Sequence, residues 1–323
     1  MAGGEGKVGK RLTIAVCAMF SIAFIAVVTT KAQSLDRRLL SLVPPGAQIV
    51  AGMRAPSQQR LSGSFLLITH HNKIDLRDFI ALSGVDDARV IHQLIIVATD
   101  GRDGPRTEHS LLAGGHFEQA HIFKAAVENG ARMEAYRGTQ ILAVEPFERD
   151  RGNFNDVRWL AVIDSKVAVF GTISSVQQEL DRYRAKSAPD PSLMQRLARF
   201  RRDDETWCML KAFEGNQEIR RALGSLDRIF TSLANDIEAF QFGVRSGGHV
   251  EFEYEVTAAS DDSAQSISSA LTQSLRAGNP ERMLPDLRTA IRNRGFMHGV
   301  IKVSRSRYER WLDELSARSR ASQ

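Results

Sequence analysis

The segment Val250-Glu251-Phe252-Glu253-Tyr254-Glu255-Val256 decides the predicted fold class, because large apolar residues alternate with glutamates along it. Successive side chains of a β-strand point to opposite faces of the sheet, so this strand has one face in a core and the other in water. Parallel sheets are usually buried on both faces, so the alternation favours an antiparallel sheet. A turn at 246–248 joins this strand to an apolar strand at 238–244, which predicts a hairpin.

An amphipathic helix follows this hairpin. Its apolar residues recur three or four positions apart, at Ala264, Ile267, Leu271 and Leu275. The same order occurs earlier in the chain, where hairpins turning at 137–138 and 164–165 precede a helix that Thr172 can cap. We therefore predict an α+β fold with antiparallel sheets, helices packed on one face, and two related subdomains with hairpin-then-helix elements.

The remaining predicted elements follow from apolar periodicity and from turn residues. Strands are expected at 48–53, 94–99, 110–114, 206–212 and 296–303. Helices are expected at 58–70, 76–83, 117–128, 193–200, 217–233, 283–293 and from 308 onward. Pro189 and Pro191 mark a break, so we predict a first subdomain at 42–188 and a second at 189–323.

Residues 1–32 have the pattern of a signal peptide or N-terminal membrane anchor, with Lys7, Lys10 and Arg11 before an uncharged apolar run at 12–30. The basic flank stays in the cytoplasm, which places the following ectodomain outside the cytoplasmic membrane. Cleavage before Gln33 would give a periplasmic protein. We favour an uncleaved inner-membrane anchor at 12–30, because the run approaches the ~20 residues that span a bilayer. Residues 33–41 are predicted as a tether.

Charge and cysteine content exclude several classes of function. The net charge is +5, and residues 1–32 contain four cations and one anion, so about +2 remains for the ectodomain. Basic and acidic residues are interleaved there, as at 201–205, which predicts no nucleic-acid partner. The ectodomain has a single cysteine, Cys208, in an apolar run that predicts a buried side chain and not a nucleophile.

The candidate catalytic residues are His109, His116, His121 and Glu118. Glu118 and His121 would share a helix face, three residues apart. His116 and His121 are five apart and would diverge on a helix, so they do not form a metal-binding pair. Gly114-Gly115 precedes a helix but lacks the third glycine and the lysine of a phosphate-binding loop. The sequence therefore predicts neither a metal site nor a cofactor.

Several segments carry a family resemblance. The stretch Leu42-Val43-Pro44-Pro45-Gly46-Ala47, which leads into 49–53, resembles the opening of uncharacterised exported proteins of acidobacteria and related soil bacteria. Residues 84–86, 114–117 and 168–171 are similar to later parts of that family. The resemblance implies an α+β fold and a location in the cell envelope, and it transfers no active-site residue.

Three functions remain open at this point. The leading hypothesis is a non-catalytic binding or scaffold ectodomain outside the cytoplasmic membrane, with an envelope protein or a small ligand as its partner. The alternatives are an envelope hydrolase with a dispersed active site and a membrane-anchored regulator or assembly factor. Function resides in sites and not in folds, so the choice among these three functions depends on the geometry of a site in the folded chain.

Overall fold

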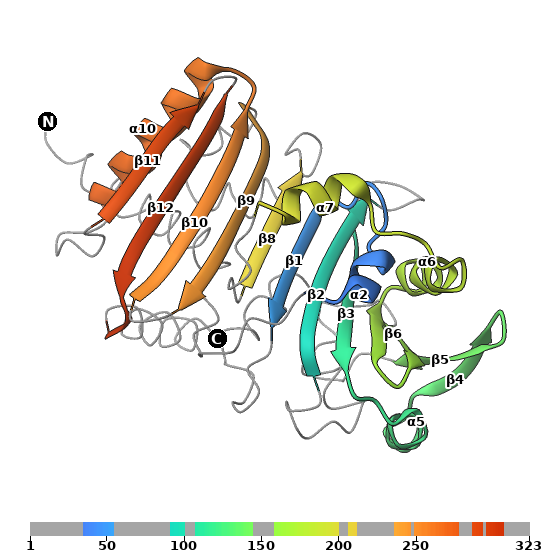
Figure 1. Ribbon diagram of the computed structural model, residues 1–323. Coiled ribbons are helices and arrows are strands. Elements are labelled where there is room, and N and C mark those ends of the chain that lie inside the picture. The colour runs from blue at the N-terminus through green and yellow to red at the C-terminus, as the bar shows by residue number, and fades with distance from the viewer. Residues whose placement is uncertain are drawn as a thin grey trace, which may run out of the picture. The chain divides into compact units, whose positions relative to one another are not determined.

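The computed structural model describes residues 35–54, 91–100, 107–144, 158–199, 206–211, 236–246, 249–277, 286–292 and 295–306 (Figure 1). These residues form two compact units, one between residues 30 and 202 and one between residues 203 and 323. Every strand pair described within each unit is antiparallel. The predicted α+β class with antiparallel sheets is therefore confirmed.

The first unit contains a sheet in the order β1-β2-β3-β7-β6-β5-β4. Its strands are β1 (Ile49–Arg54), β2 (Ile91–Asp100), β3 (Thr107–Gly115), β4 (Arg132–Tyr136), β5 (Thr139–Val144), β6 (Arg158–Asp164) and β7 (Val167–Gly171). Helix α5 (Gln119–Glu128) follows β3, and the chain then forms the meander β4 to β7. The meander returns to the sheet because its last strand, β7, pairs with β3.

Helix α6 (Ile173–Arg184) follows β7 and packs against β3, β6 and β7. It begins where predicted, because the Thr172 hydroxyl accepts a hydrogen bond from the Ser175 amide at 3.4 Å. Helix α7 (Pro191–Leu197) begins two residues before the predicted start, with Asp190 as its cap and proline in its first turn. Both helices lie in the first unit.

The prediction of a tether at 33–41 is wrong for the described part of that segment. Arg37–Leu42 form helix α2, which Asp36 caps and which packs against α6 and β3. Leu39, Leu40 and Leu42 are at most 1% exposed. These leucines give a short helix enough apolar surface to join the core, so the segment belongs to the first unit.

The centre of the first sheet is buried on both faces. All five residues of β7 are buried, and so are the successive residues Leu94 to Ala98 of β2. Since successive side chains point to opposite faces, neither face of the sheet is in water here. The centre of this sheet therefore lacks the solvent-exposed face that the Val250–Val256 pattern predicts.

The second unit contains a sheet in the order β8-β9-β10-β12-β11. Its elements are β8 (Thr206–Lys211), β9 (Ile237–Ser246), β10 (His249–Ala258), α10 (Asp261–Ala277), β11 (Asp286–Arg292) and β12 (Phe296–Ser304). The predicted hairpin β9–β10 and the helix after it are confirmed. Helix α10 packs along β10, β11 and β12 (Figure 1).

The alternation along β10 is confirmed as well. Val250, Phe252 and Tyr254 are at most 1% exposed. On the opposite face, Glu251 forms an ion pair with Lys302 Nζ at 2.7 Å and a second ion pair with Arg245. Glu253 lies 2.9 Å from His298 Nε2, and Glu255 accepts a hydrogen bond from Gln241. The glutamate face is therefore a charged ladder.

The prediction of a helix at 283–293 is wrong, because Asp286–Arg292 form strand β11. This strand pairs with β12 in a register that runs from Asp286 opposite Lys302 to Arg292 opposite Phe296. Leucine, arginine and alanine in the segment favour a helix locally. Pairing with the neighbouring strand overrides that weak preference.

Other predictions fall on parts of the chain outside the described residues. These are the N-terminal segment 1–32 with its apolar run and the helices at 58–70, 76–83, 217–233 and from 308. Within the described ranges, no helix combines the length and the apolar character needed to cross a membrane.

Candidate functional site

The candidate site is a groove between α5 and the hairpin β4–β5. Helix α5 ends in a tight turn, in which the Ala131 amide donates to the Ala126 carbonyl at 2.9 Å. Gly130 has a φ of 91°, a left-handed conformation that glycine adopts without steric cost. The turn leads the chain from the helix straight into β4, so the last turn of α5 lies beside the hairpin.

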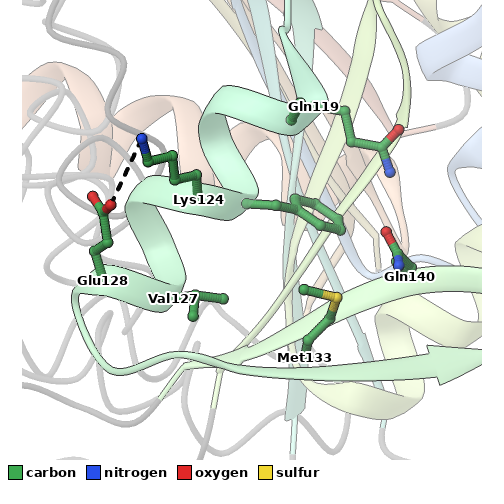
Figure 2. Close-up of a pocket in the computed structure, with 8 residues that line it drawn as sticks. Gln119, Lys124, Val127, Glu128, Met133 and Gln140 are labelled. Carbon is green, nitrogen blue, oxygen red and sulfur yellow. Dashed lines mark ion pairs between the residues drawn. The ribbon is translucent and has the colours of Figure 1, made fainter.

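The groove has a volume of about 640 Å³ (Figure 2). Its walls are formed by Gln119, Ala120, Phe123, Lys124, Val127 and Glu128 from α5, and by Met133 and Gln140 from the hairpin. Met133 stands opposite Leu142 and Gln140 stands opposite Ala135 in the β4–β5 register. Met133 and Gln140 therefore belong to the same face of the hairpin, the face that α5 flanks.

Two large apolar side chains are exposed in the groove. Val127 is 44% exposed and Met133 is 50% exposed, and they are the two exposed large apolar residues among the side chains whose burial the structure describes. Phe123 is 5% exposed and lies deeper in the same groove. Single exposed apolar residues are ordinary on protein surfaces, but these two line one concave surface, which makes the groove the candidate binding site.

The rim of the groove is polar. Lys124 Nζ lies 4.0 Å from Glu128 Oε1, and their side chains are 76% and 65% exposed (Figure 2). A pair this exposed contributes little to stability. Gln119 and Gln140 complete the polar edge. An apolar centre within a polar rim is the usual composition of a surface that binds another protein.

The hairpin that carries Met133 is fixed at its turn. Arg137 and Gly138 have φ values of 46° and 80°, as a two-residue type I′ turn requires. Helix α6 holds this turn: Asp181 accepts hydrogen bonds from the Tyr136 hydroxyl and from Arg137, each at 3.0 Å. Arg184 donates to the Arg137 carbonyl. One wall of the groove is therefore held in place by α6.

The predicted catalytic residues do not share one environment. His109 is buried within β3 at 8% exposure, whereas His121 is exposed on α5. Glu118 precedes α5, and its side chain makes no capping hydrogen bond. His116 is exposed, and its ring lies 5.1 Å from the ring of His92 in an edge-to-face arrangement. Burial and the neighbouring His116 lower the pKa of His92.

The turn at Gly114-Gly115 has a structural role. The Gly115 amide donates to the Lys166 carbonyl at 2.9 Å, and the Phe117 amide donates to the Ser165 carbonyl at 2.8 Å. These two amides are therefore engaged by the β6–β7 turn and do not point to an anion. In the described part of the chain, no group of three or more His, Cys, Asp or Glu residues is placed to hold a metal ion. Cys208 is buried in β8, as predicted.

A buried carboxylate lies in the first unit, where sequence reasoning missed it. Glu179 of α6 is 2% exposed and accepts a hydrogen bond from the Ser110 hydroxyl of β3. Burial raises the pKa of Glu179 to about 8, although the Ser110 bond and the charge of Arg182 oppose the shift. The acid is therefore mostly protonated at neutral pH. It is closed off from solvent, so it is not in a position to act on a substrate.

Glu179 had a detectable signal in the sequence. Thr172, Val176, Glu179 and Tyr183 follow one another at spacings of four, three and four, which places them on one helix face. Val176 is fully buried on that face. A glutamate in the middle of a core-facing helix stripe is therefore the pattern that would have predicted a buried acid.

Comparisons of the sequence with protein-family models and with curated proteins each found no match. The resemblance to exported acidobacterial proteins therefore stays a prediction.

Proposed function

We propose that this chain is a non-catalytic binding protein that holds an apolar segment of a protein partner in the groove between α5 and β4–β5. The observation that carries the proposal is the exposure of Val127 and Met133 toward one groove. Removing such side chains from water is favourable in free energy. Because protein interfaces combine an apolar centre with a polar rim, we expect the partner to be a protein.

The size of the groove fits an anchor within a larger contact. Covering a large apolar side chain contributes about 1 kcal/mol when its exposed half becomes buried. A few such side chains dominate the affinity of protein interfaces, while the surrounding polar contacts mainly exclude water. Val127 and Met133 would be those anchors, and the Lys124–Glu128 pair would lie at the edge.

We place this activity in the cell envelope. The basic residues before the apolar run at 12–30 support an inner-membrane anchor with the groove outside the cytoplasmic membrane. A membrane-anchored regulator or assembly factor is a form of the same proposal, because it would also act through a protein partner. No described contact supports the hydrolase alternative with Glu118, His109, His116 and His121.

The proposal includes two related subdomains with helices on one sheet face. In each unit a three-stranded meander (β1–β3 or β8–β10) is followed by a helix and then by strands of which the last, β7 or β12, pairs with the third strand of the meander. Helices α2 and α6 both pack on β3, and α10 packs on β10 and β12. The shared strand order supports a common architecture for the two units.

The test is peptide selection on the full chain in detergent micelles. A random peptide library displayed on phage is selected against the wild-type protein, and the enriched peptides are synthesised and measured by fluorescence anisotropy. We expect apolar-rich peptides with dissociation constants on the order of 10 µM. Val127→Glu and Met133→Glu should each weaken binding at least tenfold, on the order expected for a charge in a buried contact.

Ser266→Glu is the matched control, because it adds the same charge to an exposed position of another helix, α10. It should leave binding unchanged. The proposal is wrong if no apolar peptide is enriched, or if the two groove variants bind the selected peptides as tightly as the wild type does.

A further inference from the structure

Strand β4 ends the sheet of the first unit on the side away from β5. Arg132, Met133, Glu134 and Ala135 are all exposed along it. In the described part of the chain, no strand pairs with this outer edge. An open edge offers backbone donors and acceptors to another strand, and proteins usually protect such edges with charged side chains, proline, bulges or a covering segment.

The register of the hairpin determines which backbone groups point outward. Tyr136 and Thr139 flank the two-residue turn and form a hydrogen-bonded pair, as such hairpins require. Hydrogen-bonded and non-hydrogen-bonded pairs alternate along antiparallel strands. Glu134 and Arg132 therefore direct their backbone groups to β5, whereas Met133 and Ala135 direct their amides and carbonyls outward.

We infer that a second copy of this chain binds at this edge, with the two β4 strands antiparallel and Met133 opposite Met133 of the second copy. The charges on β4 carry this inference. In this register Arg132 of each copy stands opposite Glu134 of the other, so two oppositely charged pairs form across the contact. A register centred on Glu134 would instead place two carboxylates face to face.

The backbone and the apolar face agree with the same register. The outward amide of Met133 would donate to the Met133 carbonyl of the second copy, and the reverse bond would form by symmetry. Met133 borders the groove together with Val127 (Figure 2). Met133 of the second copy would pack beside Met133 on this face of the sheet. Such a contact is small, so we expect a dimer with a dissociation constant on the order of 100 µM.

This inference does not require the proposed function. The edge uses the backbone, the charges and Met133 of β4, whereas a peptide in the groove also requires Val127 of α5. Val127→Glu should therefore weaken peptide binding at least tenfold and leave dimerisation unchanged. Failure of the groove and failure of the edge are thus observed separately.

Charge exchange tests the register. The full chain is examined in detergent by sedimentation equilibrium over a range of concentrations. Arg132→Glu and Glu134→Arg should each weaken the dimer at least tenfold, because each places like charges opposite one another. The double variant Arg132→Glu/Glu134→Arg restores opposite charges and should dimerise within about threefold of the wild type.

Met133→Pro is the second variant. Its outward amide is not used by β5, so proline should be tolerated at this edge position while the bond to the second copy is lost. We expect a monomer with an unchanged far-ultraviolet circular dichroism spectrum. The inference is overturned if the wild type is monomeric up to about 1 mM, or if the double variant stays as weak as the single ones.

Discussion

Glu179 lies on helix α6, which packs against the sheet of the first unit, and Glu251 lies on strand β10 of the second unit. The pKa values of these two glutamates shift in opposite directions. Burial raises the pKa of Glu179 to about 8. Burial also raises the pKa of Glu251, but hydrogen bonds from Lys302 and Arg245 outweigh it and hold that pKa at about 2. One acid is therefore mostly neutral at pH 7, and the other is ionised.

The difference comes from where the nearest cations are directed. Arg182 lies one helical turn after Glu179, but its Nε donates to the Ser41 carbonyl at 2.9 Å and its Nη2 to the Ala188 carbonyl at 3.2 Å. Its own charge is therefore directed to backbone oxygens. Around Glu251, by contrast, Arg245 and Lys302 come from the two neighbouring strands and meet the carboxylate directly. The two neighbouring strands therefore place a cation on each side of Glu251, whereas, among the residues that the structure describes, no cation meets the carboxyl group of Glu179 directly.

The largest expected effect is that of Glu179→Gln on the pH dependence of stability. Because the folded pKa is raised above the unfolded value of 4.5, the folded chain binds more protons between pH 4.5 and 8. The free energy of unfolding should therefore fall as pH rises through this window. Glutamine keeps an oxygen for Ser110 and cannot ionise, so the variant should lack this fall. From pH 5 to pH 8 the variant should gain about 3 kcal/mol relative to the wild type.

Urea denaturation at pH 5, 6, 7 and 8 measures this difference. Glu128→Gln is the control, because it makes the same substitution at an exposed position of helix α5. Equal slopes for the wild type and Glu179→Gln would show that Glu179 is ionised in the folded chain and would remove the contrast with Glu251.

The second effect is that of Ser110→Ala, which removes the hydroxyl that donates to Glu179. A buried acceptor that loses its donor costs about 1–2 kcal/mol. The cost should be larger at pH 8 than at pH 5, because a hydrogen bond to an ionised carboxylate is stronger than one to a neutral acid. Unfolding free energies at the two pH values measure this, with Ser266→Ala as the exposed control. A cost that does not change with pH would contradict the assignment of the raised pKa.

The elements with strong periodicity could be predicted from the sequence. The helix capped by Thr172, the hairpins at 137–138 and 164–165, and the alternating strand β10 all depend on local spacing, and the structure contains them. Strand β11 and helix α2 were missed for opposite reasons. Pairing with β12 overrides helix-forming residues in β11, whereas tertiary burial of Leu39, Leu40 and Leu42 stabilises a helix shorter than local propensity would support.

The groove could not be predicted, because exposure depends on what covers a helix. Val127 continues the apolar spacing of Phe123 on α5, a spacing that is typical of a core-facing helix face. The structure leaves Val127 44% exposed and Phe123 only 5% exposed. Spacing identifies the apolar face of a helix, but it does not show where the neighbouring sheet stops. The four candidate catalytic residues make a similar point, because their proximity in sequence does not place them in one environment: His109 is buried and His121 is exposed.

The smallest expected effect is that of Glu251→Gln in the charged ladder. The folded pKa of about 2 lies below the unfolded value of 4.5, so the stabilisation by Glu251 is present above pH 4.5 and is lost as pH falls toward 2. The side chain is 21% exposed and Arg245 also lies 3.5 Å from Glu253, so we expect a cost of only about 1 kcal/mol at pH 7. This cost should shrink in acid, whereas the effect of Glu179→Gln grows in base.

Denaturation at pH 7 and pH 3, with Glu238→Gln on β9 as the control, measures the cost of Glu251→Gln. A cost that is as large at pH 3 as at pH 7 would mean that packing, and not the cations of the neighbouring strands, distinguishes Glu251 from Glu179.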